Sequence, residues 1–230
     1  TPRKEDDAVE ILSGVFEGKT TGTPISLVVY NRNQKSKDYS EIAACYRPGH
    51  ADYTFDAKYD FRDYRGGGRS SGRETIGRVA AGAVAAKILK ELGIALTAYT
   101  KSIGDISIST LDLAEIANNA LYMPDADAAA KASAYLDTCM QEHDSSGGVI
   151  ECIIDGMPAG IGEPVFDKLD ASLARAVMSI GAVKGFEIGD GFEAAKALGS
   201  ENNDEFYTDE DGQVKKKTNH AGGILGGISD

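Results

Sequence analysis

The chain has 230 residues, of which 42% are hydrophobic, and its formal net charge at pH 7 is -12. This acidic balance argues against general binding to nucleic acid or to an anionic membrane surface, both of which require a broad basic face. The most apolar segment, residues 79–89, is short and contains Lys87, so we expect no membrane helix, which needs about 20 apolar residues.

The amino terminus and the cysteines favour a soluble, cytoplasmic protein. The first residues, TPRKEDDAVE, are polar and lack the apolar core of a secretory signal peptide. Cys45, Cys139 and Cys152 are odd in number and widely spaced, which is typical of reduced structural thiols and not of a disulfide framework or a zinc site. Because the chain begins without Met, we expect it to be a fragment of a longer protein.

Strand and helix patterns alternate along the chain. In chain order, the predicted elements are strands at 9–18 and 23–31, a helix at 73–92, a strand at 94–103, a helix at 125–143, a strand at 147–155 and a helix at 168–179. Gly93 is the expected C-cap of the first helix, and Gly77 and Gly82 predict that this helix is central and tightly packed. Residues 31–72 lack periodicity and are expected to be a functional loop, and residues 200–217 a solvated loop.

Basic residues concentrate between Lys58 and Arg73, where five of them accompany two acidic residues. Ser71 and Glu74 have the spacing of a capping box for a helix that begins near Gly72. A helix N-terminus with glycines, serines and arginines also binds phosphate, through its N–H groups and guanidinium contacts. Two interpretations therefore stay open from the residues alone: phosphate binding, and a capped helix with a solvated basic face.

Two patterns exclude other kinds of site. In GGRSSGRE, residues 67–74, Arg73 replaces the lysine of a nucleotide-binding phosphate loop, and Glu74 replaces the Ser or Thr that would hold magnesium. The acidic residues between Glu201 and Asp211 do not match a calcium-loop pattern. We therefore expect neither an ordinary nucleotide phosphate site nor a metal site.

His50 is a candidate general acid. It lies three residues after Arg47, away from any periodic apolar face, and histidine transfers protons readily near neutral pH. A lone histidine in a loop is more often one that has no chemical role, and that interpretation stays open.

The segment RPGHADYTFDAKYDFRDYRGGGRSSGRETIGRVAAGA, residues 47–83, resembles the signature region of the chorismate synthase family. The similarity extends through residues 1–27, 150–192 and 219–229, and so covers nearly the whole chain. It implies the α+β fold of that family, a β-α-β sandwich in which antiparallel sheets are packed with helices, as a single domain over residues 1–230.

The resemblance also implies a function in the shikimate pathway of aromatic amino-acid biosynthesis. The family's lyases convert 5-enolpyruvylshikimate 3-phosphate to chorismate by a 1,4-elimination of phosphate with loss of a ring proton. Reduced FMN is required without net redox change, since the flavin lends an electron and then removes the proton. The family is usually a homotetramer and is associated with NADPH, but the sequence leaves open which reductant serves the flavin.

Site roles follow from the resemblance residue by residue. His50 is implied to protonate the reduced flavin near N1, and Arg47 and Arg73 to hold the substrate. The FMN contacts implied are Arg69, Ser70, Ser71, Gly181, Ala182 and Gly226. The family commonly has Asn in place of Gly181 and Ala in place of Gly72, so a contact of Gly181 with FMN would use its backbone.

Two segments of the family are not found in this sequence. The earlier one carries a second catalytic histidine in a GESHG-like motif, and the later one carries KPT-type and RHDP-like motifs. We therefore expect a central portion, truncated at both ends, that folds but does not turn over by itself. The alternative function is a non-catalytic phosphate- or flavin-binding module, and an acidic structural protein would bind neither ligand.

Overall fold

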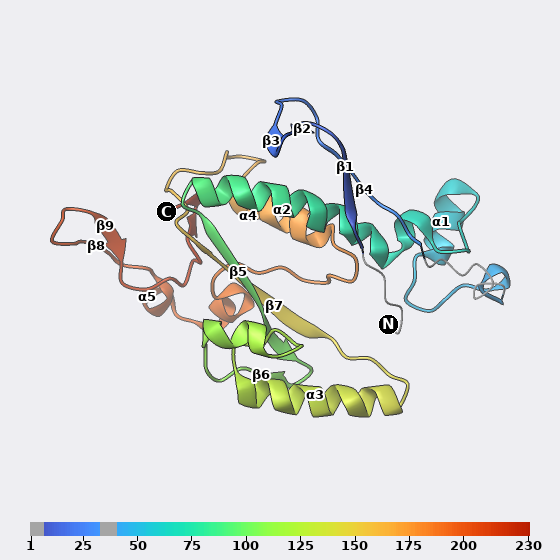
Figure 1. Cartoon of the computed structure of the whole chain (residues 1–230). Helices are drawn as coiled ribbons and strands as arrows, with labels where there is room; N and C mark the ends of the chain where they lie inside the picture. The colour runs from blue at the N-terminus through green and yellow to red at the C-terminus, as the bar shows by residue number, and fades with distance from the viewer. Residues whose placement is uncertain (1–6, 33–40) are drawn as a thin grey trace. The chain divides into compact units, whose positions relative to one another are not determined.

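The computed structural model describes residues 7–32 and 41–230. The chain divides into a first unit, residues up to 85 together with 158–230, and a second unit, residues 86–157. Both units combine helices with small antiparallel sheets (Figure 1), as expected of an α+β fold. That residues 1–230 make a single domain stays a prediction. No helix in the described part of the chain is long and apolar enough to cross a membrane.

A three-stranded antiparallel sheet forms the centre of the second unit. Its strands, in spatial order, are β6 (Ile106–Ser107), β5 (Ala95–Ile103) and β7 (Gly148–Asp155). The two long strands agree with those predicted at 94–103 and 147–155 to within one residue. Their β-branched residues suit the pleated surface of a sheet.

Helix α3 (Ala126–Gln141) packs against the β6 end of this sheet (Figure 1). The fully buried Met123 joins Ala128, Ala129 and Ala132 in a core that also contacts Ile103, Ile106, Ile108 and Leu121. Alanines on this face let the helix approach the sheet closely. The carboxylate of Asp125 caps the helix by accepting from Ala128 N at 3.0 Å, which confirms the helix predicted at 125–143.

The described residues of the first unit form four two-stranded antiparallel pairs. They are β1 (Val9–Ser13) with β4 (Ser26–Val29), β2 (Val15–Phe16) with β3 (Lys19–Thr20), β8 (Phe206–Thr208) with β9 (Val214–Lys216), and β10 (Ile224–Leu225) with β11 (Ile228–Ser229). The strand predicted at 9–18 is interrupted at Gly14, which has a φ of +82° and no room for a Cβ atom, since Pro24 O would lie 2.7 Å from it. The chain therefore turns there and forms two separate pairs.

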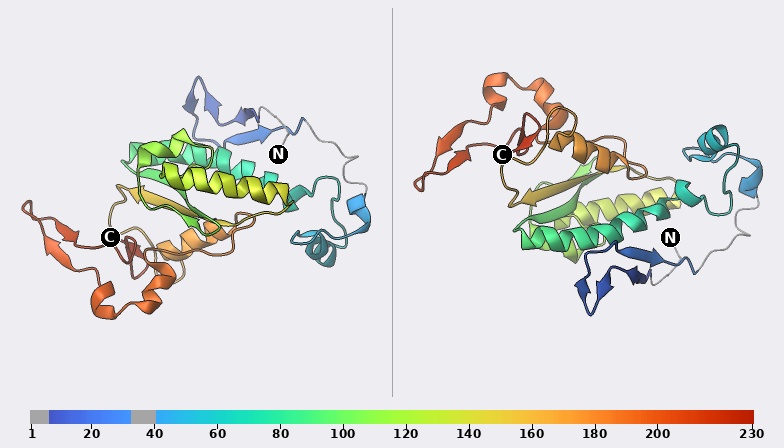
Figure 2. Two further views of the ribbon diagram at one scale, coloured as in Figure 1. Left: turned by 90° about the horizontal axis from the view of Figure 1, so that it is seen from below. Right: turned by 90° about the horizontal axis from the view of Figure 1, so that it is seen from above.

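The prediction of a solvated loop over residues 200–217 is wrong in part. This segment continues from α5 (Gly199–Asn202) into the β8–β9 hairpin, which projects from its unit (Figure 2). The Asp209 carboxylate accepts from Gln213 N at 2.8 Å and from Asp211 N at 3.1 Å. Such a local hydrogen bond builds a turn without any apolar periodicity, and this is why the pattern missed the hairpin.

Residues 41–72, within the expected functional loop, contain more helix than the sequence predicts, whereas residues 33–40 lie outside the described residues. The helical elements are η2 (Glu41–Ala44), α1 (Asp52–Tyr59), η3 (Gly68–Ser70) and η4 (Gly72–Thr75), all 3-10 turns except α1. Helix α1 is made of aromatic and charged residues and ends at Asp60, whose φ is +63°. Its stability depends on contacts of charged side chains, which have no periodic signature.

Helices α2 (Ile76–Glu91) and α4 (Leu169–Met178) confirm the predictions at 73–92 and 168–179. The expectation of a tightly packed α2 is wrong, because none of its residues is buried in the described structure and the Cβ positions at Gly77 and Gly82 meet open space. The three cysteines differ in their exposure: Cys139 is buried, whereas Cys45 and Cys152 are exposed.

Gly93 ends α2 as predicted. Its φ is +79°, its N–H donates to Lys90 O at 3.0 Å, and Ile94 N donates to Leu89 O at 2.9 Å. These two bonds are those of a Schellman motif, which satisfies carbonyls at the end of the helix.

Substituting two glycines of this region should have opposite effects on stability. Gly93→Ala should lower the free energy of unfolding by about 1 kcal/mol, because an L-residue is strained in the left-handed region. Gly82→Ala, in the helix interior with open space around its Cβ position, should raise it by about 0.5–1 kcal/mol. Urea unfolding of the purified chain measures both, and stabilisation by Gly93→Ala would contradict the capping role.

Candidate active site

Asp52 is the buried centre of the segment that carries Arg47 and His50. It is the first residue of α1, and its side chain is 2% exposed. Asp52 Oδ2 accepts from the backbone N–H of Arg47 at 3.0 Å and from its Nε at 2.8 Å, while Oδ1 accepts from Arg47 Nη2 at 2.9 Å. The guanidinium is therefore held in a two-pronged contact that fixes its plane.

His50 lies against the same pair. Its Nδ1 is 3.1 Å from Asp52 Oδ1 and 3.2 Å from Arg47 Nη2. The left-handed Gly49, with a φ of +68°, turns the chain between the two residues, and His50 N donates to Arg47 O at 3.3 Å. The His50 side chain remains 25% exposed, so one edge of the ring is accessible.

Arg62 fixes this arrangement from the segment after α1. Its Nη2 donates to three main-chain carbonyls at 2.8–3.2 Å, those of Ile42, Ala43 and Cys45. Its Nη1 lies 3.1 Å from Asp52 Oδ1, its Nε lies 3.3 Å from Asp56 Oδ2, and its guanidinium stacks over the Tyr46 ring at 4.9 Å. With a side chain only 9% exposed, Arg62 is part of the framework.

The surroundings of Asp52 keep it ionised. The Arg47 side-chain hydrogen bonds lower the pKa of Asp52 far below its ordinary range, with smaller contributions from the Arg47 N–H and from the charge of His50, whereas burial opposes the shift. Asp52 is not among the residues predicted for the site. In the sequence, only its position five residues after Arg47 and two residues after His50 could have pointed to it.

The glycine- and serine-rich segment before α2 differs in detail from the predicted capping box. Ser71 Oγ accepts from Arg73 N at 3.3 Å, as a cap, but the Glu74 carboxylate accepts from Arg78 Nη1 at 2.6 Å. The box is thus half formed, because the arginine one turn later attracts the carboxylate that should have closed it. The helix predicted to begin near Gly72 starts as the 3-10 turn η4.

Side chains of this segment differ in their accessibility. Ser70 Oγ donates to Gly67 O at 2.6 Å, in a turn where Gly67 and Gly68 both have positive φ. The Arg69 side chain is 87% exposed, and its Nη1 is 4.0 Å from Glu74. Arg73 Nη2 donates to Asp7 Oδ1 at 2.9 Å. Arg69 is therefore the guanidinium most accessible to a ligand here.

Arg78 connects this segment to the loop after α4. Its Nε donates to Ser179 Oγ at 3.2 Å, and its Nη2 donates to Ser179 O at 2.8 Å. Gly181 and Ala182 follow in that loop, and Ala182 has a φ of +70°. The structure thus brings two of the segments with expected FMN contacts together through one arginine.

Gly226 lies elsewhere in the first unit. With Gly227 it forms the two-residue turn between β10 and β11, both with positive φ, and Gly227 O accepts from Leu169 N at 2.7 Å. Among the described residues, the contacts of the expected site residues therefore fall into three groups: Arg47 with His50, the serine segment with the Ser179 loop, and the Gly226 turn. Their proposed roles stay predictions.

A second buried acid supports the loop that precedes Gly226. The Asp204 carboxylate accepts from Ala221 N at 2.9 Å, from Thr218 Oγ1 at 2.7 Å and from His220 N at 2.8 Å. These bonds, the Ala221 N–H first, lower the pKa of Asp204 to about 2. Its charge holds this loop in one conformation.

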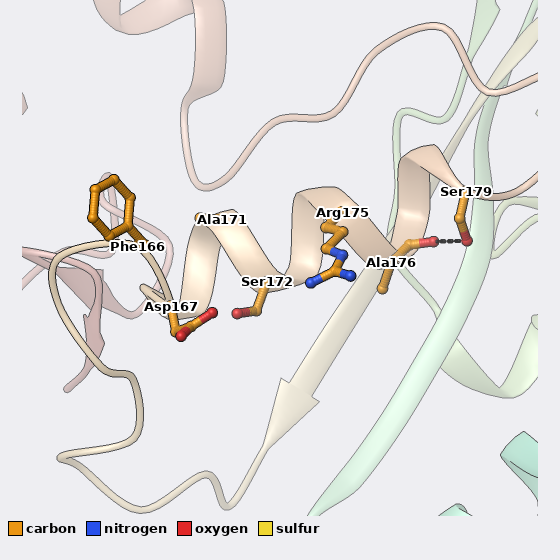
Figure 3. Close-up of a pocket in the computed structure, with 7 residues that line it drawn as sticks. All are labelled: Phe166, Asp167, Ala171, Ser172, Arg175, Ala176 and Ser179. Carbon is orange, nitrogen blue, oxygen red and sulfur yellow. Dashed lines mark hydrogen bonds between the residues drawn. The ribbon is translucent and has the colours of Figure 1, made fainter.

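A shallow concavity of about 420 Å³ lies along α4, apart from the expected residues. It is lined by Phe166, Asp167, Ala171, Ser172, Arg175, Ala176 and Ser179 (Figure 3). Asp167 and Ser172 point toward one another there, whereas Phe166 is 91% exposed. Within residues 7–32 and 41–230, no group of three or more His, Cys, Asp or Glu side chains could hold a metal ion.

Loss of the Arg62 side chain should destabilise the fold. Arg62→Ala should lower the free energy of unfolding by about 3 kcal/mol, because it removes three carbonyl hydrogen bonds and one partner of the buried Asp52. Arg69→Ala is the matched control: its exposed side chain should contribute about 0.5 kcal/mol or less. Urea unfolding compares the two, and equal stability of both variants would contradict the framework role of Arg62.

Comparison with known proteins identifies the family of the chain. The sequence profile described as chorismate synthase matches residues 1–230. Chorismate synthases of Agathobacter rectalis and Lachnospira eligens are 70% and 71% identical to this chain over 232 residues, which cover 100% of this chain and 63% of each relative. That of Cytophaga hutchinsonii is 54% identical over 234 residues, covering 100% of this chain and 65% of the relative.

A solved structure described as the crystal structure of chorismate synthase matches the fold. Its TM-score is 0.82 at 33% identity, and the match covers 97% of this chain and 68% of that one. The expected α+β fold class is thereby confirmed. The chain spans just under two thirds of the length of the curated relatives named above.

Proposed function

Because the chain belongs to the chorismate synthase family, we propose that it provides part of the site that converts 5-enolpyruvylshikimate 3-phosphate to chorismate. The reaction is a 1,4-elimination in which the ring loses phosphate and a proton. The observation that carries the proposal is the Asp52-centred arrangement, which holds Arg47 and His50 within 3.2 Å of one another. An anion-binding group and a proton-transfer group are thus fixed side by side.

Arginines bind the anionic substrate in this proposal. Arg47 is oriented by its two-pronged contact with Asp52 and keeps a side chain 28% exposed. Arg73 is 33% exposed and lies at the start of the helical run. Guanidinium groups bind carboxylate and phosphate oxygens, so the two residues suit a substrate that carries both groups.

The donor set before α2 fits the phosphate of FMN. The exposed Arg69 guanidinium and the Ser71 hydroxyl supply a positive charge and an O–H donor at the start of the helical run, the chemistry that binds a phosphate monoester. The Ser70 O–H, which donates to Gly67 O, would have to turn toward the ligand to join them. Gly181, Ala182 and Gly226 would contact the cofactor through their backbones. When bound, reduced FMN would lend an electron that assists phosphate departure and would take it back together with the ring proton, so that no net redox change results.

His50 holds its transferable proton at Nε2. The Nδ1–H of the ring donates to Asp52 Oδ1, the acceptor that lies 3.1 Å away. The second proton of the charged ring is then on Nε2, directed away from Asp52, and its loss leaves a neutral ring that keeps the Nδ1–H. A proton at that atom is placed for transfer to a group bound outside the cluster.

The assembly and compartment belong to the same proposal. A homotetramer in the cytoplasm, with NADPH as the source of electrons for the flavin, is what the family resemblance implies. The surface of α2 supports self-association, because Val79 is 71% exposed beside the open Gly77 and Gly82. Small and apolar residues suit close packing of a partner helix.

Catalysis should depend on His50 in a protein of the relatives' full length that carries this sequence, called the full-length protein below. With reduced FMN under anaerobic conditions, it should form chorismate and phosphate in equal amounts from the enolpyruvyl substrate. His50→Ala should lower turnover roughly 100-fold, the usual contribution of a general acid, with little change in melting temperature. Chorismate absorbance and phosphate release measure the rate.

His143→Ala is the matched control, because His143 is exposed and lies in the second unit. It should retain wild-type turnover. Retained turnover in folded His50→Ala would remove the general-acid assignment. FMN binding without product, and without tightening when substrate is added, would instead support the alternative of a non-catalytic flavin-binding module.

Substrate affinity should depend on the Arg73 guanidinium. In the full-length protein, Arg73→Ala should weaken substrate binding by about 2 kcal/mol, because a charge-assisted contact is lost. Asp7→Asn removes the ion pair of Arg73 but keeps its guanidinium, and should leave substrate affinity close to that of the wild type. Isothermal titration of both variants measures this, and equal affinities for the Arg73 variant and the wild type would contradict the assignment.

A further inference from the structure

We infer that Asp52 is the positioning residue of the proposed site: its carboxylate orients Arg47 and gives the His50 ring a partner at Nδ1 in either protonation state. The inference rests on the proposed function of Arg47 and His50. It concerns a residue that touches neither substrate nor cofactor in the proposal and acts through the two side chains that do.

The Asp52 carboxylate binds several groups of Arg47 at once. Asp52 accepts three hydrogen bonds from Arg47, including the backbone N–H. It therefore closes the loop between residues 47 and 52 as well as orienting the guanidinium. Its position as the first residue of α1 adds the positive end of the helix dipole to these contacts.

The carboxylate of Asp52 also balances the positive charges around it. The charged or titratable side chains that face Asp52 are Arg47, His50 and Arg62, and Asp56 lies behind Arg62. Arg47 Nη2 and His50 Nδ1 are only 3.2 Å apart, so without a negative charge an imidazolium and a guanidinium would repel one another. The carboxylate makes their proximity stable.

The contacts of His50 Nδ1 support the same role for Asp52. This atom lies between an acceptor, Asp52 Oδ1 at 3.1 Å, and a donor, Arg47 Nη2 at 3.2 Å. The charged ring carries a proton on both nitrogens, and its Nδ1–H donates to Asp52. When the ring is neutral, the Nε2 proton has left and the Nδ1–H still donates to Asp52. The ring therefore gains and loses its proton at Nε2 without having to turn over.

Asp52→Asn tests this inference, with Asp56→Asn as the matched control. Both changes replace a carboxylate by an amide on α1. In the described structure, however, Asp56 contacts Arg62 and makes no ion pair with Arg47 or His50. The first readout is nitrogen-15 NMR of the His50 ring in the purified chain near neutral pH, which distinguishes its two neutral tautomers. In the neutral ring, wild type and Asp56→Asn should show the proton on Nδ1, where it donates to Asp52, and Asp52→Asn should populate both tautomers.

The second readout is kinetic, in the full-length protein. Asp52→Asn should lower kcat by roughly 10- to 100-fold, as a small misplacement of a reacting group does, while Asp56→Asn stays within about twofold of the wild type. If Asp52→Asn does not fold, Asp52→Glu keeps the charge and displaces the carboxylate by one methylene. The same two effects are expected of it.

Two results would overturn the inference: an unchanged Nδ1–H tautomer in a folded Asp52 variant, or a shifted tautomer with wild-type kcat. The tautomer measurement does not depend on turnover. If the wild-type full-length protein forms no chorismate, the proposed function fails while the NMR result still decides whether Asp52 sets the state of His50.

Discussion

The buried charge of Asp52 is the constraint on which the rest of the site depends. A carboxylate removed from water is costly unless hydrogen bonds and opposite charges compensate for it. Here Arg47 supplies three donors and Arg62 a further positive charge, and Arg62 is in turn held by three main-chain carbonyls. The Asp52 carboxylate therefore organises three segments: the 47–52 loop, helix α1 and the turn at Ile42–Cys45. The position of His50 depends on the same carboxylate.

Buried acids recur as local organisers in this acidic chain. Asp125 in the second unit accepts from Ala128, Ser109 and Thr110 main-chain N–H groups, which lower its pKa. Asp204 in the first unit accepts from Ala221 and His220 N–H groups. In each case the carboxylate replaces a missing backbone acceptor where the chain turns. Part of the net charge of -12 is thus structural, and its distribution says little about ligands.

The sequence predicted what depends on repeated local pattern, and missed what depends on a single contact. The helices of α2, α3 and α4 and the strands β5 and β7 have apolar periodicity or β-branched runs and were found nearly to the residue. Helix α1 and the β8–β9 hairpin are stabilised by Asp52 and Asp209, each acting once, so no pattern revealed them. In the site, His50 was a candidate from its position after Arg47, and the roles of both residues came from a resemblance to a family that the comparisons confirm. Asp52 was missed because its role appears only when the loop is closed.

The basic segment itself divides by exposure into framework and accessible groups. Arg62 is 9% exposed and bound to three carbonyls and two acids, whereas Arg69, seven residues later, is 87% exposed. Glycines between them, with Gly67 and Gly68 in the left-handed region, let the chain turn so that neighbouring arginines have different surroundings. A cluster of like charges need not be a single binding surface. Here Arg62 pairs with the buried Asp52 and the partly exposed Asp56, whereas Arg69 stays accessible to solvent.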